Sequence, residues 1–168
     1  RRKSDSDECL MIFQFIPMIM KVVGLVGSPR SGGNTATLVS QALAGAASAG
    51  AQTELVHIPS LSISGCHGCK YCKTHDSCRI EDDMQKIYEK IRSADGIIFG
   101  TPVYFAQMTG QMKLCIDRLY ALITPEYTSR LAPGKKAAVI MTQGDENAEA
   151  FTSIVETFRF AMDFLGVA

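Results

Sequence analysis

The sequence lacks any excess of charge, because 17 basic residues balance 17 acidic residues among its 168 residues. A neutral chain has no overall field that would draw it to nucleic acid or to an anionic membrane, so any anion site must be local. Internal repeats, low-complexity tracts and an interdomain linker are also lacking. With 46% apolar and 20% charged residues, a chain of this length fits one globular domain with a sizeable core.

A segment suited to crossing a membrane is lacking as well. The nearest candidate is the apolar stretch 10–20, which is short and is interrupted by Gln14 and Pro17. Acidic residues precede it, which is untypical of a secretory signal. We therefore expect residues 1–20 to be an extension outside the fold and residues 21–168 to form the domain. At the other end, Val167 is expected to begin a further strand that the chain does not complete.

Strand and helix patterns alternate strictly along the rest of the chain. Aliphatic runs typical of strands buried on both faces occur at residues 22–26, 53–58, 97–100 and 137–141. Apolar stripes of helical period occur at residues 35–48, 84–91, 112–119 and 151–165. This alternation predicts an α/β fold with a mostly parallel, doubly wound sheet covered by helices on both faces. In such sheets, ligands bind at the carboxyl ends of the strands.

The loop after the first strand has the residue types that bind an anion. It reads Gly27-Ser28-Pro29-Arg30-Ser31-Gly32-Gly33-Asn34-Thr35 and opens into a helix for which Asn34 is the expected N-cap. Backbone amides, the helix dipole and the loop hydroxyls would face the anion, with the arginine as counter-charge. The loop has neither the lysine of a nucleoside-triphosphate P-loop nor the G-x-G-x-x-G dinucleotide pattern. We therefore predict a phosphate site of another kind.

Two further loops follow later strands at the same predicted edge. The third strand leads into Thr101-Pro102-Val103-Tyr104-Phe105, where proline stiffens the turn and the aromatic residues could contact a flat ligand. Ordinary packing of the two aromatic side chains in a core or an interface is the alternative. The fourth strand leads into Thr142-Gln143-Gly144, whose glycine lets the backbone approach a ligand closely.

Cysteines are concentrated in one segment. Four of the six lie between Cys66 and Cys78, which favours a local site in a reducing cytoplasm over a disulfide scaffold. Their spacing is C-x2-C-x2-C-x5-C. Three thiolates at three-residue intervals can wrap one side of a cubane iron–sulfur cluster, and the fourth can close it.

Other interpretations of the cysteine segment stay open. Zinc is one alternative, with His67 or His75 supplying missing ligands. Redox-active thiols that hold no metal are another. Cys115 lies on the apolar stripe of a predicted helix and is interpreted as a core residue, while Cys9 lies in the N-terminal extension. Neither is included in the predicted site.

The three loops, taken in order, resemble those of the flavodoxin-like NAD(P)H-dependent FMN reductase family, and the run Met108 to Arg118 is similar to that family too. The cysteine spacing resembles the compact motif of the iron–sulfur flavoproteins, a subgroup with the same fold. It differs from the bacterial ferredoxin run, which has three residues before its last cysteine and a proline after it. The resemblance implies the strand order 2-1-3-4-5, with the fifth strand incomplete here, and it implies FMN and a [4Fe–4S] cluster as cofactors.

The resemblance also implies which residues bind each cofactor. For FMN they are Ser28, Arg30, Ser31, Gly33, Asn34, Thr35, Thr101, Pro102, Val103, Tyr104, Phe105, Thr142 and Gly144. For the cluster they are Cys66, Cys69, Cys72 and Cys78, in an inserted segment at residues 65–79. Because this segment and the three loops all follow strand ends, we expect the cluster on the flavin side of the sheet, whether in the same subunit or across an interface.

The expected function is that of an FMN-dependent oxidoreductase of the iron–sulfur flavoprotein type, passing electrons between NAD(P)H or ferredoxin and an acceptor. No side chain is expected to be catalytic, because the flavin is the reactive centre. One alternative is a cluster-free NAD(P)H-dependent FMN, quinone or nitro reductase. Another is an FMN electron carrier that does not use nicotinamide. The resemblance further implies a homodimer or homotetramer whose redox partner is a small molecule or a ferredoxin-type protein.

Overall fold

A parallel sheet forms the centre of the computed structural model, which describes residues 19–147 and 149–168. Its long strands lie in the order β2-β1-β3-β5, and the short strand β4 adds to β3 in the antiparallel direction. The strands are β1 (Lys21–Val26), β2 (Gln52–His57), β3 (Gly96–Tyr104), β4 (Gln107–Met108) and β5 (Lys136–Thr142). The predicted flavodoxin-like strand order is confirmed, with β5 as the fourth long strand.

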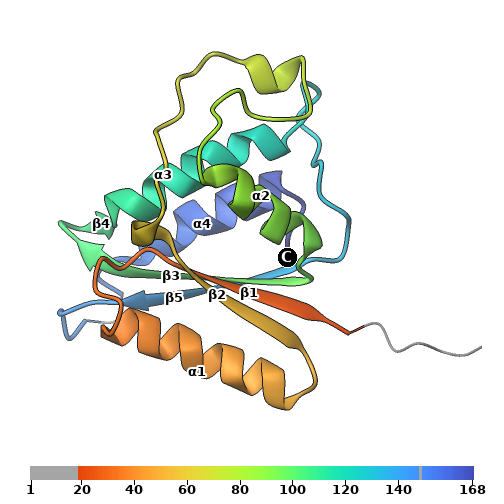
Figure 1. Ribbon diagram of the computed structural model, residues 1–168. Coiled ribbons are helices and arrows are strands. Elements are labelled where there is room, and N and C mark those ends of the chain that lie inside the picture. Colours follow the sequence, from red (N-terminus) through yellow and green to blue (C-terminus); the bar gives the residue numbers. More distant parts are fainter. Residues whose placement is uncertain (1–18, 148) are drawn as a thin grey trace, which may run out of the picture.

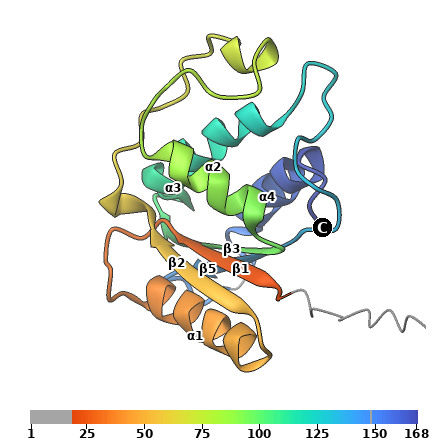
Figure 2. The same cartoon turned by 45° about the vertical axis from the view of Figure 1, so that its right-hand side comes forward.

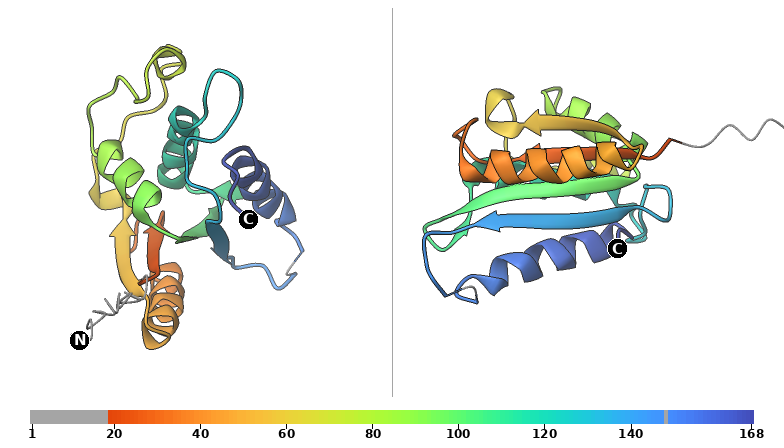
Figure 3. Two further views of the ribbon diagram at one scale, coloured as in Figure 1. Left: turned by 90° about the vertical axis from the view of Figure 1, so that its right-hand side faces the viewer. Right: turned by 90° about the horizontal axis from the view of Figure 1, so that it is seen from below.

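Helices cover both faces of the sheet, as expected (Figure 1). They are α1 (Asn34–Ser48), α2 (Met84–Ser93), α3 (Gly110–Arg118) and α4 (Thr152–Phe164). Short 3₁₀ turns lie at Ile58–Ser60, Tyr71–Lys73 and Leu119–Leu122. Helix α1 packs on one face, and α2, α3 and α4 pack on the other (Figure 3). None of the described helices is long and apolar enough to cross a membrane.

Two glycines let α1 approach the sheet closely. A Cβ atom on Gly24 would lie 2.6 Å from Cγ1 of Val39, and one on Gly100 would lie 2.5 Å from Cγ2 of the same valine. Both distances are shorter than any van der Waals contact, so side chains at these positions would push α1 away. The close packing fixes the N-terminus of α1 at the edge where β1 and β3 end.

The larger part of the core lies between the sheet and the other three helices. Phe99 of β3 packs against Phe158 of α4 with ring centroids 5.4 Å apart, and both side chains are fully buried. Ile91 of α2 and Met112 of α3 complete this layer. Phe99 belongs to an apolar run predicted as a strand, and the other three residues belong to stripes predicted as helices.

The two ends of the described chain both join the sheet. The carbonyl oxygen of Met20 accepts a hydrogen bond from Gln52 N at 2.8 Å. Ala168 N donates to Lys135 O at 3.1 Å, and Ala168 O accepts from Ala137 N at 2.7 Å, a pattern of parallel pairing along β5. The chain after α4 therefore runs along this edge in the direction expected of a further strand. The proposed extension at 1–20 falls mainly on residues 1–18, which lie outside the described residues, so that boundary stays a prediction.

Candidate functional site

Three loops meet at the carboxyl edge of the sheet, where β1, β3 and β5 end. Thr35 Oγ1, in the first turn of α1, lies 2.6 Å from Thr142 Oγ1 at the end of β5. Gly27 N, after β1, donates to Gly100 O of β3 at 2.8 Å. The structure therefore brings together the three segments that the sequence singled out, although they lie far apart along the chain.

The first loop leaves the N-terminus of α1 open. Its N-cap is Gly33 and not Asn34 as predicted, and no side chain of the described residues caps the first amides of the helix. Ser28 and Thr35 are buried, with 3% and 2% of their surface exposed, while Arg30 and the remaining polar loop residues are exposed. Ser28 Oγ accepts from Arg30 N at 3.2 Å, which shapes the turn. Uncapped amides beside buried hydroxyls are suited to binding an anion at the positive end of the helix.

Thr109 ties this loop to α3, a role that the sequence analysis did not identify. Its Oγ1 caps α3 by accepting from Met112 N at 3.2 Å, and it donates to Gly27 O at 2.8 Å. Its amide donates to Thr101 Oγ1 at 3.1 Å. A Cβ on Gly27 would lie 2.7 Å from Met112 Cβ, so only glycine fits there. A threonine directly before an apolar helical stripe is the N-cap signal that could have predicted this contact.

The second loop differs from the prediction. Strand β3 does not end at Gly100 but continues through Thr101 to Tyr104, because these residues pair with β5 on one side and β4 on the other. The turn falls at Phe105 and Ala106, both with left-handed backbone (φ 48° and 62°). Two-residue hairpins of type I′ require positive φ at both positions, which is costly for residues other than glycine. The Phe105 ring is fully exposed at its tip.

The third loop is ordered by the side chain of Gln143. Its Nε2 donates to Asp145 O at 3.1 Å and to Asn147 O at 2.6 Å. Its Oε1 is buried and has no hydrogen-bond partner among the described residues. Beside the Thr142 hydroxyl, this free acceptor suits a ligand that carries a donor group.

A second site lies over the helical layer, in the segment between β2 and α2 (Figure 2). A cavity of about 150 Å³ is lined by Cys66, Cys69, Cys72 and Cys78 together with Arg118. The first two cysteines are exposed and the last two are half-buried, and none is in a disulfide. Burial raises the pKa of Cys72, with Cys78 and Cys66 adding to the rise, while Lys73 opposes it. The four predicted ligands are therefore brought to one place.

Basic side chains hold this segment on the chain after α3. Lys73 Nζ donates to Ile123 O at 2.6 Å and to Tyr120 O at 3.1 Å, and it lies 3.5 Å from the centroid of the Tyr120 ring. Arg130 Nη1 donates to Cys72 O at 3.3 Å. Burial lowers the pKa of Lys73. These contacts fix the backbone around Cys72 from outside the cysteine segment.

Arg118 and Asp82 join the two ends of the cysteine segment, at Ser64 and Ile80, which we call its stems. Arg118 Nη1 and Nη2 donate to Asp82 Oδ2 and Oδ1 at 2.8 and 3.1 Å, in a pair with 1% and 10% of the side chains exposed. Arg118 also donates to Ser64 O at 2.8 Å and Ile80 O at 3.3 Å, on either side of the cysteines. Burial alone would raise the pKa of Asp82, but the arginine and the amides of Ser64 and Met84 lower it. The stems are closed by protein contacts alone.

The position of this cavity corrects one expectation. Within one chain, the cysteines do not lie beside the three loops at the carboxyl edge of the sheet, because the segment after β2 crosses over α3 to its far end. Gly110 begins α3 near the three loops, whereas Arg118 ends it at the cavity. With a rise of 1.5 Å per residue, the helix separates the two sites by about 12 Å. Strand order alone does not predict the position of the segment between β2 and α2, because this segment is long enough to leave the carboxyl edge of the sheet.

His75, beside the cysteines, contacts neighbouring aromatic and hydroxyl groups. Among residues 19–147 and 149–168, no three histidine, cysteine or acidic side chains converge closely enough to hold one metal ion. The His75 ring stacks on Tyr71 at 3.7 Å, and its Nδ1 lies 2.9 Å from Thr74 Oγ1. Cys115 is fully buried in the core, as predicted, and burial raises its pKa to about 12.

Similar proteins bear out the resemblance seen in the loops. An iron–sulfur flavoprotein of Methanocaldococcus jannaschii is 44% identical over 99 residues, covering 59% of this chain and 51% of the relative. One of Methanosarcina thermophila is 37% identical over 128 residues, covering 76% of this chain and 65% of the relative. The chain thus spans about half to two thirds of the length of these relatives.

The fold also matches a solved NAD(P)H:quinone oxidoreductase of Methanothermobacter marburgensis, with a TM-score of 0.68 at 21% identity, covering 89% of this chain and 79% of that one. Residues 20–163, a range that includes the three loops and the cysteine segment, match the family model of the NADPH-dependent FMN reductases. The chain belongs to the NADPH-dependent FMN reductase family, whose members are flavin-dependent oxidoreductases.

Proposed function

We propose that this chain binds FMN and a [4Fe–4S] cluster and passes electrons between NAD(P)H or ferredoxin and an acceptor. The observation that carries the proposal is the convergence of four cysteines on one cavity in a chain of the FMN reductase family. Relatives named as iron–sulfur flavoproteins support it. The flavin supplies two-electron hydride chemistry and one-electron exchange when it is bound.

The carboxyl-edge loops fit FMN. Amides at the N-terminus of α1, the buried hydroxyls of Ser28 and Thr35, and the Arg30 guanidinium would hold the phosphate. The second loop would hold the isoalloxazine edge, with Val103 and Tyr104 nearest to the ring. Thr142 and Gly144 would close the site from the third loop, where Gln143 Oε1 offers a free acceptor. The described residues hold no second phosphate loop, which favours FMN over FAD.

The cysteine cavity fits a cubane cluster better than zinc. Each thiolate of a [4Fe–4S] cluster binds a different iron, so the sulfurs stand further apart than around one ion. Four cysteines line one cavity. Among the described residues, no three candidate ligands converge on a position for a single metal ion. Soft thiolate ligands are those that iron–sulfur clusters require. The preformed stems at Asp82 and Arg118 hold the segment ready for the cluster.

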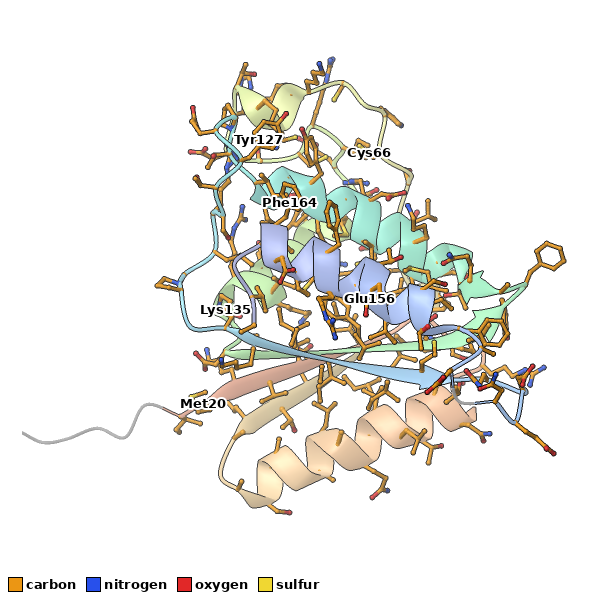
Figure 4. All side chains as sticks on the ribbon, turned by 180° about the vertical axis from the view of Figure 1, so that it is seen from behind. Met20, Cys66, Tyr127, Lys135, Glu156 and Phe164 are labelled. Atoms are coloured by element: carbon orange, nitrogen blue, oxygen red, sulfur yellow. The ribbon has the colours of Figure 1, made fainter. Side chains whose placement is uncertain are left out.

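Assembly into a homodimer or homotetramer is part of the proposal. An apolar groove of about 460 Å³ runs between α3 and α4 and is lined by Tyr127, Phe160 and Phe164. It shares Cys66 and Tyr120 with the cysteine cavity, and Figure 4 shows Cys66, Tyr127 and Phe164 at the same end of the molecule. A second copy seated in this groove would lie beside the cysteine cavity, because groove and cavity share lining residues.

Rapid mixing under anaerobic conditions tests the activity. NADPH or NADH is mixed with the purified flavoprotein, and bleaching of the flavin absorbance is followed in time. Rapid bleaching supports a nicotinamide-dependent oxidoreductase. Absence of bleaching with both nucleotides, combined with rapid reduction by a ferredoxin, would leave ferredoxin as the donor. Slow reduction by all three donors would overturn the proposed activity.

A further inference from the structure

We infer that Arg118 is a positioning residue for the cluster, with its Nε–H donating a hydrogen bond to the Cys78 thiolate or an adjoining sulfide. The inference rests on the proposed cluster and deepens it. The Arg118 side chain would thereby influence the reduction potential of the cluster.

The first observation is an unused donor. Arg118 is 1% exposed, and four of its hydrogen bonds, through Nη1 and Nη2, go to Asp82, Ser64 and Ile80. Its Nε is buried and has no partner in the part of the chain that the structure describes. A buried N–H without an acceptor is destabilising. The same side chain lines the cysteine cavity, where a bound cluster would supply acceptors.

The second observation points to Cys78 as the ligand beside Arg118. The two side chains line the same cavity, and Arg118 Nη2 donates to Ile80 O at 3.3 Å, two residues beyond Cys78. Tyr88 cannot give its hydrogen to sulfur while its hydroxyl donates to Arg118 O at 2.8 Å. Exposed Arg79 also lines the cavity, but it is free to move in solvent. Arg118 is the cation that the fold holds in place beside Cys78.

The chemical consequence concerns the reduction potential. One-electron reduction adds negative charge to a cluster and its thiolates. A fixed hydrogen bond and a buried positive charge stabilise that added charge, and hydrogen bonds to sulfur are a main determinant of cluster potential. The guanidinium of Arg118 therefore raises the potential, and Asp82, which carries the opposite charge, lowers it.

Three variants separate this role from a structural one. Arg118→Lys keeps the charge but removes the Nε donor, so the cluster potential should shift to a more negative value. Asp82→Asn removes the negative charge from the same pair, so the potential should shift to a more positive value. Arg79→Lys, at an exposed arginine on the same cavity, is the matched control and should leave the potential unchanged.

Potentials are measured by anaerobic titration with dithionite and mediators, followed by electron paramagnetic resonance of the reduced protein. Iron and sulfide contents are measured first, because a parent protein without a cluster would refute the proposed function and not the role of Arg118. If Arg118 only held the stems together, both stem variants would shift the potential in the same direction. That result, or an unchanged potential in Arg118→Lys, would overturn the inference.

A measurement on the parent covers the case in which Arg118→Lys fails to fold. Protein labelled with ¹⁵N-arginine is reduced and examined for nitrogen hyperfine coupling to the cluster. Coupling in the parent and in Arg79→Lys supports the inference. Its absence from the parent, or its loss in Arg79→Lys, would overturn it.

Discussion

The hydroxyl groups of Thr35 and Thr142 lie 2.6 Å apart and join the first turn of α1 to the end of β5. Only one of the two can donate in this bond, so the hydrogen of the other is free to point elsewhere. Both residues lie beside the uncapped amides of α1. The pair therefore offers a donor to an anion and also fixes the distance between two loops of the site.

The first prediction concerns FMN affinity. Changing Ser28 and Thr35 together to alanine should weaken FMN binding by a few kcal/mol, because each hydrogen bond to a charged phosphate is worth about 1.5–3 kcal/mol. Isothermal calorimetry of the flavin-free protein measures the change. Thr37→Ala is the matched control, since its exposed hydroxyl donates to Gly33 O at 3.2 Å on the outside of α1. Equal affinities in the double variant and the parent would refute the assignment of this loop.

The second prediction concerns the cysteines. Cys69→Ser should lose or cripple the cluster but retain FMN, because a hard hydroxyl is a poor replacement for a thiolate at iron. Reduction of the flavin by nicotinamide should persist, while one-electron exchange with a viologen should fall steeply. Stopped-flow absorbance follows both steps. Cys115→Ala, a change in the core away from the cavity, should keep the cluster.

An unaltered rate of one-electron exchange in Cys69→Ser would show that the cysteine segment is not an electron relay. The cluster-free reductase would then be the better description.

The third prediction concerns acid stability. The pKa of Asp82 is lowered in the folded protein, as its bonds to Arg118 and two backbone amides outweigh burial. Its stabilising contribution is therefore present above the unfolded pKa of about 3.9 and is lost as the pH falls through the lower, folded pKa. Asp82→Asn should cost about 3–5 kcal/mol at neutral pH.

Urea unfolding of parent and Asp82→Asn between neutral and acid pH measures this difference. The gap between the two proteins should narrow as the pH falls below about 4. A gap that stays constant over this range would show that ionised Asp82 does not stabilise the stems.

The fourth prediction concerns the hairpin between β3 and β4. Ala106 has φ 62°, which costs an L-residue about 1–2 kcal/mol, so Ala106→Gly should stabilise the fold by about 0.5–1 kcal/mol after the entropy of glycine is counted. Thermal unfolding measures the change. Ala44→Gly, at an exposed position inside α1, is the control and should destabilise by about 1 kcal/mol. Destabilisation by both variants would show that the hairpin is not strained.

The sequence predicted the order of the sheet and the meeting of its three loops, because these follow from strand burial and from the topology of parallel strands. It misjudged the end of β3, since pairing with β4 and β5 extends the strand through Tyr104. It also placed the cysteine segment beside the three loops, whereas within one chain the segment lies at the far end of α3. A segment of this length is positioned by tertiary contacts such as those of Arg118 and Lys73, which local patterns do not reveal.

The absorption spectrum of anaerobically purified protein, combined with flavin, iron and sulfide analysis, tests the central claim most directly. The account predicts flavin bands together with a broad iron–sulfur band, and about one FMN, four iron atoms and four sulfides per chain. Flavin with no iron or sulfide, even after anaerobic reconstitution with both, or zinc in their place, would contradict it.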